Sequence, residues 1–170
     1  MATSENIGAM KSHKNLRKQI ESIKKQKIAA RKIVSLEEFR LLKTSSESPT
    51  VLVVDDDEIM RNAIKRILEA EGYEIALAKD GLELSKIIEA RRLDLILLDV
   101  NLPWVDGIEL CQLIKSHHSL KNVPLILISG RKSREDIERG FEAGCDDFIG
   151  KPFEVDHITS VIRERIAKSS

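Results

Sequence analysis

Two patterns of apolar residues alternate along the chain after about residue 50. Short, nearly continuous apolar runs are separated by longer stretches in which apolar residues recur every three or four positions. The first pattern indicates strands buried on both faces, and the second indicates amphipathic helices. The predicted strands are Val51–Asp55, Tyr73–Ala78, Leu93–Asp99, Pro124–Ser129 and Asp147–Gly150.

A helix is predicted after each strand. Gly72 and Gly144 follow two of these helices, where glycine commonly closes a helix, and Ser133 is a capping residue. Strands and helices that alternate through short loops predict a parallel sheet covered on both faces. Right-handed crossovers favour a doubly wound α/β fold with strand order 2-1-3-4-5. The predicted helices cover residues 58–71, 81–92, 107–117, 133–143 and 154–167.

The beginning of the chain follows a different pattern. From Lys11 to Val34 it predicts one basic helix with a narrow apolar stripe, and a second short helix follows from Ser35 to Leu42. Residues 44–50 have the composition of a linker. The sequence therefore predicts a basic, mostly helical extension and linker over residues 1–48 and an α/β domain over residues 49–170.

Charge separates the same two parts. Residues 1–50 contain 11 Lys and Arg against 5 Asp and Glu, whereas residues 51–170 contain 17 against 23. No apolar run approaches the roughly 18 residues that a membrane span needs, and the N-terminus lacks the apolar core of a secretory signal. Cys111 and Cys145 are too few for a disulfide framework. We expect a soluble, cytoplasmic protein with reduced thiols and no membrane span.

Polar side chains gather at the ends of the predicted strands. Asp55 and Asp56 follow the first strand and Asp99 ends the third, and these strands are neighbours in the predicted order. Ser129 ends the fourth strand, and Lys151 follows the fifth. Ligands of open α/β sheets bind in the crevice outside the carboxyl ends of the strands. We therefore expect these groups to converge in one crevice.

The chemistry of such a cluster points to a cation and a phosphoryl group. Carboxylates about 4 Å apart repel each other by roughly 4 kcal/mol at an effective dielectric constant of about 20, so a cation is expected among them. Hard oxygen ligands favour Mg²⁺. Asp99 is then placed to act as a nucleophile that carries an acyl phosphate, with Lys151 as a cationic partner and Ser129 as a hydroxyl donor. Each residue alone is more often a cap, a turn or a solvated side chain, and only their joint placement supports this interpretation.

Four motifs carry a resemblance to a known family. VLVVDDD, LLDVNLPWVDG, LILISG and DDFIGKPF, in this order, resemble the receiver domain of two-component response regulators over about residues 50–168. The resemblance implies a flavodoxin-like fold with a five-stranded parallel sheet and five helices. It also implies that Asp99 accepts a phosphoryl group from a sensor histidine kinase or a histidine phosphotransfer protein.

The same resemblance implies a role for each residue of a magnesium site. Asp56 and Asp99 would bind Mg²⁺ directly, and Asp55 would bind it through water. Asn101 would supply its backbone carbonyl oxygen.

A switch is also implied by the resemblance. Ser129 would move its hydroxyl onto the phosphoryl group, and Phe148 occupies the position of an aromatic residue that turns inward as Ser129 moves. The peptide bond between Lys151 and Pro152 would be cis, which would direct Lys151 into the crevice. Phe148 lacks the hydroxyl of the usual tyrosine, and Gly130 replaces a frequent alanine.

The leading hypothesis is a phosphorelay response regulator that signals to an unidentified protein target and turns over no free metabolite. One alternative is a regulator that binds nucleic acid through its basic N-terminal helix, and the apolar stripe of that helix could instead form a homodimer. Another is a Mg²⁺-dependent aspartyl-phosphate hydrolase. The hydrolase is disfavoured because its nucleophile should lie early in the chain and a cap domain should cover the substrate.

Three further side chains have expected positions. Cys111 and Phe141 fall at helical spacing and are expected in the core. Trp104 is expected either to cover a loop while half-buried or to anchor a partner protein.

Overall fold

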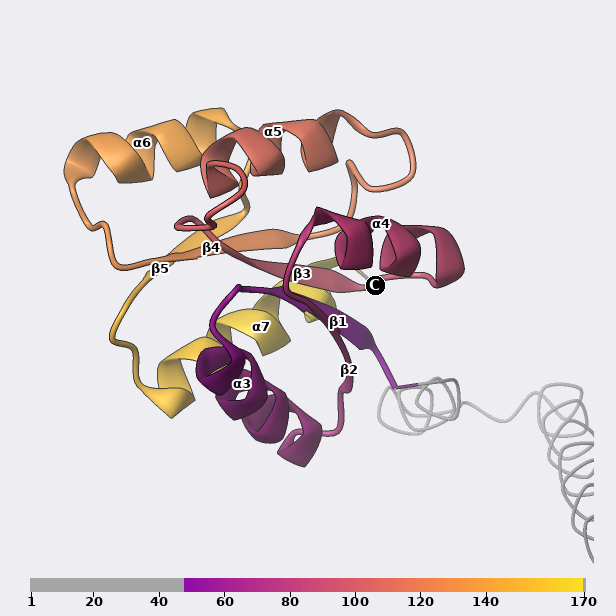
Figure 1. The fold of residues 1–170 in the computed structure, drawn as a ribbon. Helices are drawn as coiled ribbons and strands as arrows, with labels where there is room; N and C mark the ends of the chain where they lie inside the picture. Colours follow the sequence, from indigo (N-terminus) through magenta and orange to yellow (C-terminus); the bar gives the residue numbers. More distant parts are fainter. Residues whose placement is uncertain (1–47, 170) are drawn as a thin grey trace, which may run out of the picture. The chain divides into compact units, whose positions relative to one another are not determined.

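The computed structural model describes residues 48–169, in which five strands and five helices alternate (Figure 1). The predicted N-terminal extension therefore lies almost entirely outside the described residues, and its proposed homodimer and nucleic-acid contacts stay predictions. The strands are β1 (Thr50–Val54), β2 (Glu74–Ala78), β3 (Leu95–Asp99), β4 (Leu125–Ser129) and β5 (Asp147–Gly150). The helices are α3 (Glu58–Ala70), α4 (Gly81–Ala90), α5 (Gly107–Ser116), α6 (Arg134–Glu142) and α7 (Val155–Ser169).

All strand pairs are parallel, and the strand order is β2-β1-β3-β4-β5. The predicted fold class and topology are thereby confirmed. No helix within residues 48–169 is long and apolar enough to cross a membrane.

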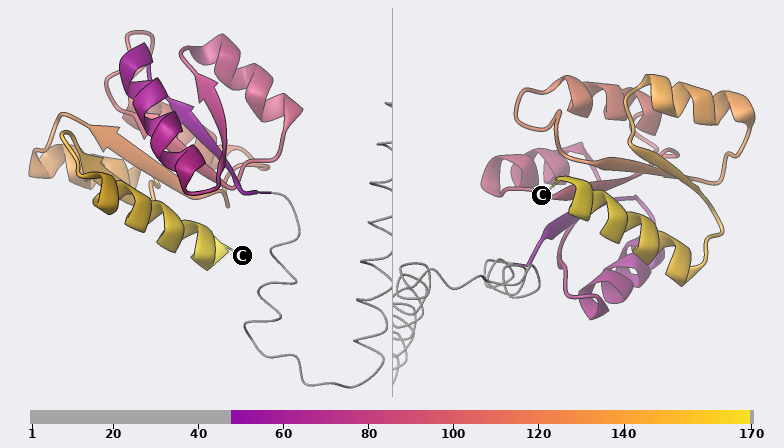
Figure 2. Two further views of the ribbon diagram at one scale, coloured as in Figure 1. Left: turned by 90° about the horizontal axis from the view of Figure 1, so that it is seen from below. Right: turned by 180° about the vertical axis from the view of Figure 1, so that it is seen from behind.

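Two apolar cores lie on opposite faces of the sheet. Helices α4, α5 and α6 cover one face, and α3 and α7 cover the other (Figures 1 and 2). Alternate residues of each strand feed the two cores, so that Leu52 packs in one and Val53 in the other. Because both faces are covered, β1, β3 and β4 are buried along their whole length. This burial explains why these strands are continuous apolar runs.

The two residues that directly precede β3 and β5 bind the neighbouring strand in the same way. Asp94 donates its N–H to the carbonyl oxygen of Thr50 at 2.9 Å, and its Oδ2 accepts the N–H of Thr50 at 2.9 Å. Asp146 repeats this pair of bonds with Leu125, at 2.8 Å for both. These reciprocal bonds anchor the first residues of β1 and β4 at the amino edge of the sheet.

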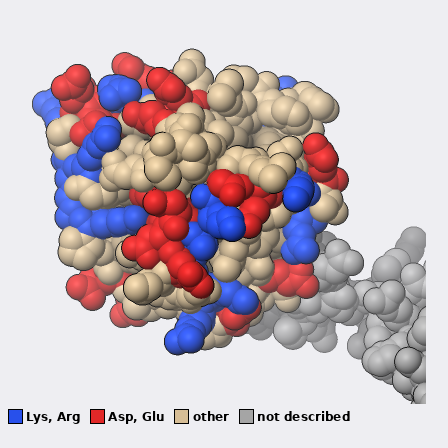
Figure 3. Space-filling view, viewed as in Figure 1, with Lys and Arg blue, Asp and Glu red and all other residues tan. Residues whose placement is uncertain are grey.

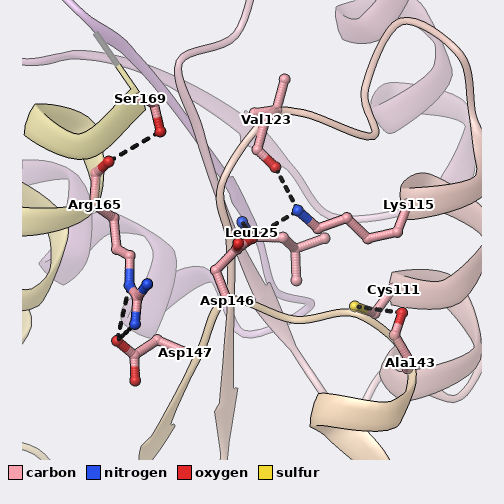
Figure 4. A network of polar contacts seen from close by, with 9 residues as sticks. All are labelled: Cys111, Lys115, Val123, Leu125, Ala143, Asp146, Asp147, Arg165 and Ser169. Atoms are coloured by element: carbon pink, nitrogen blue, oxygen red, sulfur yellow. Dashed lines mark hydrogen bonds and ion pairs between the residues drawn. The ribbon is translucent and has the colours of Figure 1, made fainter.

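Asp146 also belongs to a polar network between α5 and the sheet (Figure 4). The ammonium group of Lys115 lies 2.6 Å from Asp146 Oδ2 and donates to the carbonyl oxygen of Val123 at 2.8 Å. The Lys115 side chain is 14% exposed and that of Asp146 is 36% exposed, so this ion pair is partly shielded from water. Nearby, Cys111 is buried as predicted, and its thiol contacts the carbonyl oxygen of Ala143.

The prediction for Phe141 is wrong, because its side chain is 50% exposed. The face of α6 that contacts the sheet is occupied by the preceding residue, Gly140. A methyl group at Gly140 would lie 3.0 Å from Leu127 and 3.2 Å from Phe148. Successive helical residues point about 100° apart. Phe141 consequently points away from the sheet.

Candidate functional site

The carboxyl ends of β1, β3, β4 and β5 bring the predicted polar side chains together. Val54 of β1 pairs with Leu98 of β3, so Asp55 and Asp99 follow at the same level. At the ends of the other two strands, Ser129 of β4 pairs with Gly150 of β5. Two of the three aspartates considered for the site, Asp55 and Asp99, are buried.

Asp55 is held at every polar atom. Its N–H donates to the carbonyl oxygen of Ala78 at 3.2 Å. Its Oδ1 accepts the N–H of Asp57 at 2.8 Å, and its Oδ2 accepts the ammonium group of Lys151 at 3.0 Å. The carbonyl oxygen of Asp55 accepts a guanidinium N–H of Arg61 at 2.6 Å. The carboxylate is therefore fixed in one orientation with both oxygens in use.

Asp99 is 4% exposed, and its carboxylate is less well satisfied. The ammonium group of Lys151 lies 3.1 Å from Asp99 Oδ1, but the angles do not fit a hydrogen bond. Among residues 48–169, Oδ1 is the buried side-chain polar atom that lacks a hydrogen-bond donor. Burial raises the pKa of Asp99 although the charge of Lys151 opposes this shift. The site thus contains an oxygen that is open to a further cation or donor.

Lys151 lies between the two buried carboxylates. Its peptide bond to Pro152 is cis, as the resemblance implied, and its N–H donates to the carbonyl oxygen of Ser129 at 2.7 Å. Burial alone would lower the pKa of Lys151, but its hydrogen bond to Asp55 and the charge of Asp99 raise that pKa above the ordinary value. Lys151 is therefore a permanent cation in the crevice.

The residues present fit a magnesium ion. One carboxylate oxygen from each of Asp55, Asp56 and Asp99 lies within 4.8 Å of the others. Asp56 is exposed, and no hydrogen bond or ion pair of its side chain is found within residues 48–169. Carboxylate oxygens with room for water, next to an unsatisfied oxygen of Asp99, are the donor set that Mg²⁺ prefers. On the face shown in Figure 3, acidic side chains gather near the centre with basic side chains beside them.

Ser129 lies at the site but does not contact the other groups. It is fully buried, and its hydroxyl oxygen accepts the N–H of Arg131 at 2.9 Å. Within the described part of the chain, the hydroxyl makes no hydrogen bond with Asp99 or Lys151. Phe148 is partly buried and packs beside Leu127 of β4 and Gly140 of α6. The structure therefore brings Asp55, Asp56, Asp99 and Lys151 together and leaves Ser129 and Phe148 alongside them.

The loop between β3 and α5 forms the outer wall of the site. Asn101 and Asp106 form an isolated antiparallel bridge across this loop. The side chain of Asp106 caps α5 by accepting the N–H of Ile108 at 2.8 Å. The guanidinium group of Arg131 lies 3.9 Å from the other oxygen of Asp106. A pocket of about 330 Å³ opens here, lined by Asp56, Val100, Asn101, Leu102, Pro103, Asp106 and Arg131.

Trp104 lies in this loop and packs on the loop before α4, which agrees with its predicted role as a cover for a loop. Its indole N–H donates to the carbonyl oxygen of Lys79 at 3.3 Å, and its ring lies 3.3 Å from the position that a methyl group at Gly81 would occupy. The side chain is 38% exposed. Trp104 therefore ties the β3–α5 loop to the loop before α4.

Two contributions to the site were not predicted from the sequence. Arg61 contacts Asp55 from α3, and Gly107 lets the first turn of α5 approach the end of β3. The arginine lies on the exposed side of an amphipathic pattern, where the usual interpretation is a solvated charge. An Asp-Gly dipeptide is typical of a turn, but the close backbone contact at Gly107 has no sequence signal.

Comparisons with known proteins agree with this geometry. The family model of the response regulator receiver domain matches residues 51–163. The chain is 34% identical over 120 residues to response regulator MprA of Mycobacterium sp. (strain KMS), covering 71% of this chain and 51% of that protein. It is 34% identical over 123 residues to aerobic respiration control protein ArcA of Escherichia coli (strain K12), covering 72% of this chain and 50% of that protein. The chain thus matches about half the length of these curated relatives.

Solved structures show the same fold. The receiver domain of the Francisella response regulator 1452 superimposes with a TM-score of 0.67 at 31% identity, covering 72% of this chain and all of that chain. The receiver domain of the sensor histidine kinase PA1611 from Pseudomonas aeruginosa PAO1, solved with a magnesium ion in its active-site cleft, gives a TM-score of 0.64 at 28% identity. That match covers 71% of this chain and 98% of the other. The protein described here belongs to the response regulator receiver domain family of two-component signalling proteins.

Proposed function

We propose that Asp99 receives a phosphoryl group from a phosphohistidine of a sensor histidine kinase or a histidine phosphotransfer protein, with Mg²⁺ as the cofactor. The observation that supports this proposal best is the environment of Asp99. It is a buried carboxylate with one unsatisfied oxygen, 3.1 Å from a lysine ammonium group and next to two further carboxylates. A nucleophilic carboxylate, a cation and ligands for a second cation are the groups that phosphoryl transfer needs.

The transfer step follows from these groups. An oxygen of Asp99 attacks the phosphorus atom, the bond between phosphorus and the histidine nitrogen breaks, and the imidazole keeps the electron pair and takes a proton. The ammonium group of Lys151, now hydrogen-bonded to Asp55 and ion-paired with Asp99, would turn to a phosphoryl oxygen, which needs only a small displacement because the group is already at the site. Bound Mg²⁺ would offset the negative charge that develops on the other phosphoryl oxygens.

The contacts of each carboxylate suggest how Mg²⁺ would be held. Both oxygens of Asp55 are already used by Asp57 and Lys151, which favours its action through a water molecule. Asp56 and Asp99 would bind the ion directly, together with the backbone carbonyl oxygen of Asn101. A magnesium ion in the cleft of the receiver domain of PA1611 supports this assignment by similarity.

The signal would leave the site through Ser129 and Phe148. For the Ser129 hydroxyl to reach a phosphoryl group, its hydrogen bond with the N–H of Arg131 must break. Phe148 would then repack, and the surface of α6, β5 and α7 would change for a protein partner. Phosphorylation would shift a two-state equilibrium that exists without it. Because Phe148 has no hydroxyl, its own part in this change would be a change of packing and not of a hydroxyl hydrogen bond.

The domain boundary belongs to the same proposal. Residues 49–170 would form the receiver domain, and residues 1–48 would form its extension and linker.

Receiver domains act in signalling and not as metabolic enzymes, so the only reactions proposed here are phosphorylation of Asp99 and loss of that phosphate.

Phosphorylation by acetyl phosphate tests the proposal. The full chain should take up acid-labile, hydroxylamine-sensitive phosphate in the presence of Mg²⁺ and not with EDTA. Asp99→Asn should abolish uptake. Asp80→Asn is the matched control, because Asp80 caps α4 and asparagine can also cap a helix. Undiminished labelling of the Asp99→Asn variant would refute the assignment, and steady hydrolysis of a generic phosphoester would favour the aspartyl-phosphate hydrolase.

A further inference from the structure

Arg61 reaches the acidic site from the first turns of α3. Its N–H donates to the carbonyl oxygen of Asp57, and its guanidinium group donates to the carbonyl oxygen of Asp55 at 2.6 Å. The side chain therefore folds back over the turn that carries the acidic residues. It is half-buried, unlike a freely solvated arginine.

The bond from Arg61 falls on the peptide group that joins Asp55 to Asp56. The other polar atoms of Asp55 are held by Ala78, Asp57 and Lys151, so Arg61 supplies the remaining contact of that residue. The side chain of Asp56 has no hydrogen bond or ion pair within residues 48–169. The backbone therefore determines from which point the Asp56 carboxylate reaches into the site, and the bond from Arg61 restrains the peptide plane before Asp56.

We infer that Arg61 is a positioning residue for the magnesium site and acts through the Asp55–Asp56 peptide group. It does not touch the ion or the phosphoryl group. This inference rests on the proposed function, because it assumes that Asp56 is a direct ligand of Mg²⁺. Groups that orient metal ligands without binding the metal typically account for about 10-fold or more in metal affinity.

Charge and position predict opposite effects for this residue. A guanidinium group beside the site repels a divalent cation, so a role through charge alone predicts tighter Mg²⁺ binding when the charge is removed. A positioning role predicts weaker binding, because the Asp55–Asp56 peptide group loses the bond that restrains its carbonyl oxygen. The sign of the change in affinity separates the two roles.

The experiment is a calorimetric titration of the full chain with MgCl₂. We expect Arg61→Gln to raise the Kd for Mg²⁺ about 10-fold. Arg61→Lys should raise it several-fold, because the ammonium group keeps the charge but lacks the planar fork of the guanidinium group. Arg66→Gln is the matched control, since Arg66 lies exposed on the same helix. Urea unfolding of each variant in EDTA measures any loss of stability separately.

Several outcomes would overturn the inference. Wild-type or tighter affinity in Arg61→Gln would exclude positioning. A loss of stability without a change in Kd would leave Arg61 a structural residue only. If the wild-type chain itself bound no Mg²⁺, the proposed function would fail together with this role. If the wild type binds Mg²⁺ and Asp56→Asn does not, the proposed function is supported. The role of Arg61 is then decided by the Kd of the Arg61 variants.

Discussion

Replacing Gly107 by alanine is expected to destabilise the domain, because a methyl group at this position meets backbone atoms. It would lie 2.3 Å from the carbonyl oxygen of Asp99 and 2.5 Å from the Cα atom of Val100. Ordinary contacts between carbon atoms are about 3.5–4.0 Å. The N–H of Val100 donates to the carbonyl oxygen of Ile128 in β4 at 3.0 Å, so the end of β3 cannot move away freely. No side chain can rotate to relieve the clash, and α5 itself must shift.

The magnitude follows from two losses and one gain. Overpacking of a rigid site costs about 1–3 kcal/mol, and a clash with backbone belongs at the upper end of that range. The shift would also weaken the hydrogen bond from the N–H of Gly107 to Val100, now 2.9 Å long, at a cost of about 1 kcal/mol. Alanine regains about 1 kcal/mol over glycine in a helix. The expected net loss is therefore about 3 kcal/mol in the free energy of unfolding.

Urea unfolding of three glycine variants tests this reasoning. Gly130→Ala has no atom closer than 4.0 Å to the new methyl group and should change the free energy of unfolding by less than about 0.5 kcal/mol. Gly72→Ala meets no atom within 4 Å, but its φ of +89° should cost about 1 kcal/mol through backbone strain alone. A Gly107→Ala variant that is no less stable than Gly72→Ala would refute the argument from contact.

Three further predictions concern the packing around the sheet. Lys115→Met should cost about 2 kcal/mol in urea unfolding, between the values for exposed and buried ion pairs, because it leaves Asp146 without its cation; a loss below about 0.5 kcal/mol would contradict this. Trp104→Ala should speed hydrogen exchange in the β3–α5 loop roughly 5-fold, and Trp104→Phe should do so less because its ring can still pack on Gly81; equal exchange in all three proteins would contradict the tie between the loops. Burial raises the pKa of Cys111 to about 11 and that of Cys145 to about 12. At about pH 8 a thiol reagent should therefore modify the folded chain roughly 100-fold or more slowly than the chain in urea, and comparable rates would contradict this burial.

The fold could be predicted because most strands carry an unambiguous signal. A strand buried on both faces must be apolar along its whole length, and β3 and β4 consist almost entirely of leucine and isoleucine. Once the strands are assigned, right-handed crossovers restrict their order. The ends of the strands were predicted less precisely. The strand β3 begins at Leu95 and not at Leu93, because the side chain of Asp94 accepts a hydrogen bond from the N–H of Thr50.

Strand topology accounts for one part of the site, and side-chain packing accounts for the other. Asp55, Asp99 and Lys151 are placed by topology, so their convergence was predictable. The hydrogen bond of Arg61 and the cover formed by Trp104 depend on how long side chains lie over neighbouring turns, which no spacing encodes. Phe141 was assigned to the core because periodicity does not show that a glycine beside it takes the contact with the sheet.

The reciprocal bonds of Asp94 and Asp146 limit how a phosphorylated domain could rearrange. A strand that slipped by one residue would break both bonds at its first residue and would exchange the faces of all its side chains. These bonds therefore oppose sliding of β1 against β3 and of β4 against β5. We expect the amino edge of these strands to stay fixed on phosphorylation and the largest displacements to occur in the loops around Asp99, at the opposite edge of the sheet.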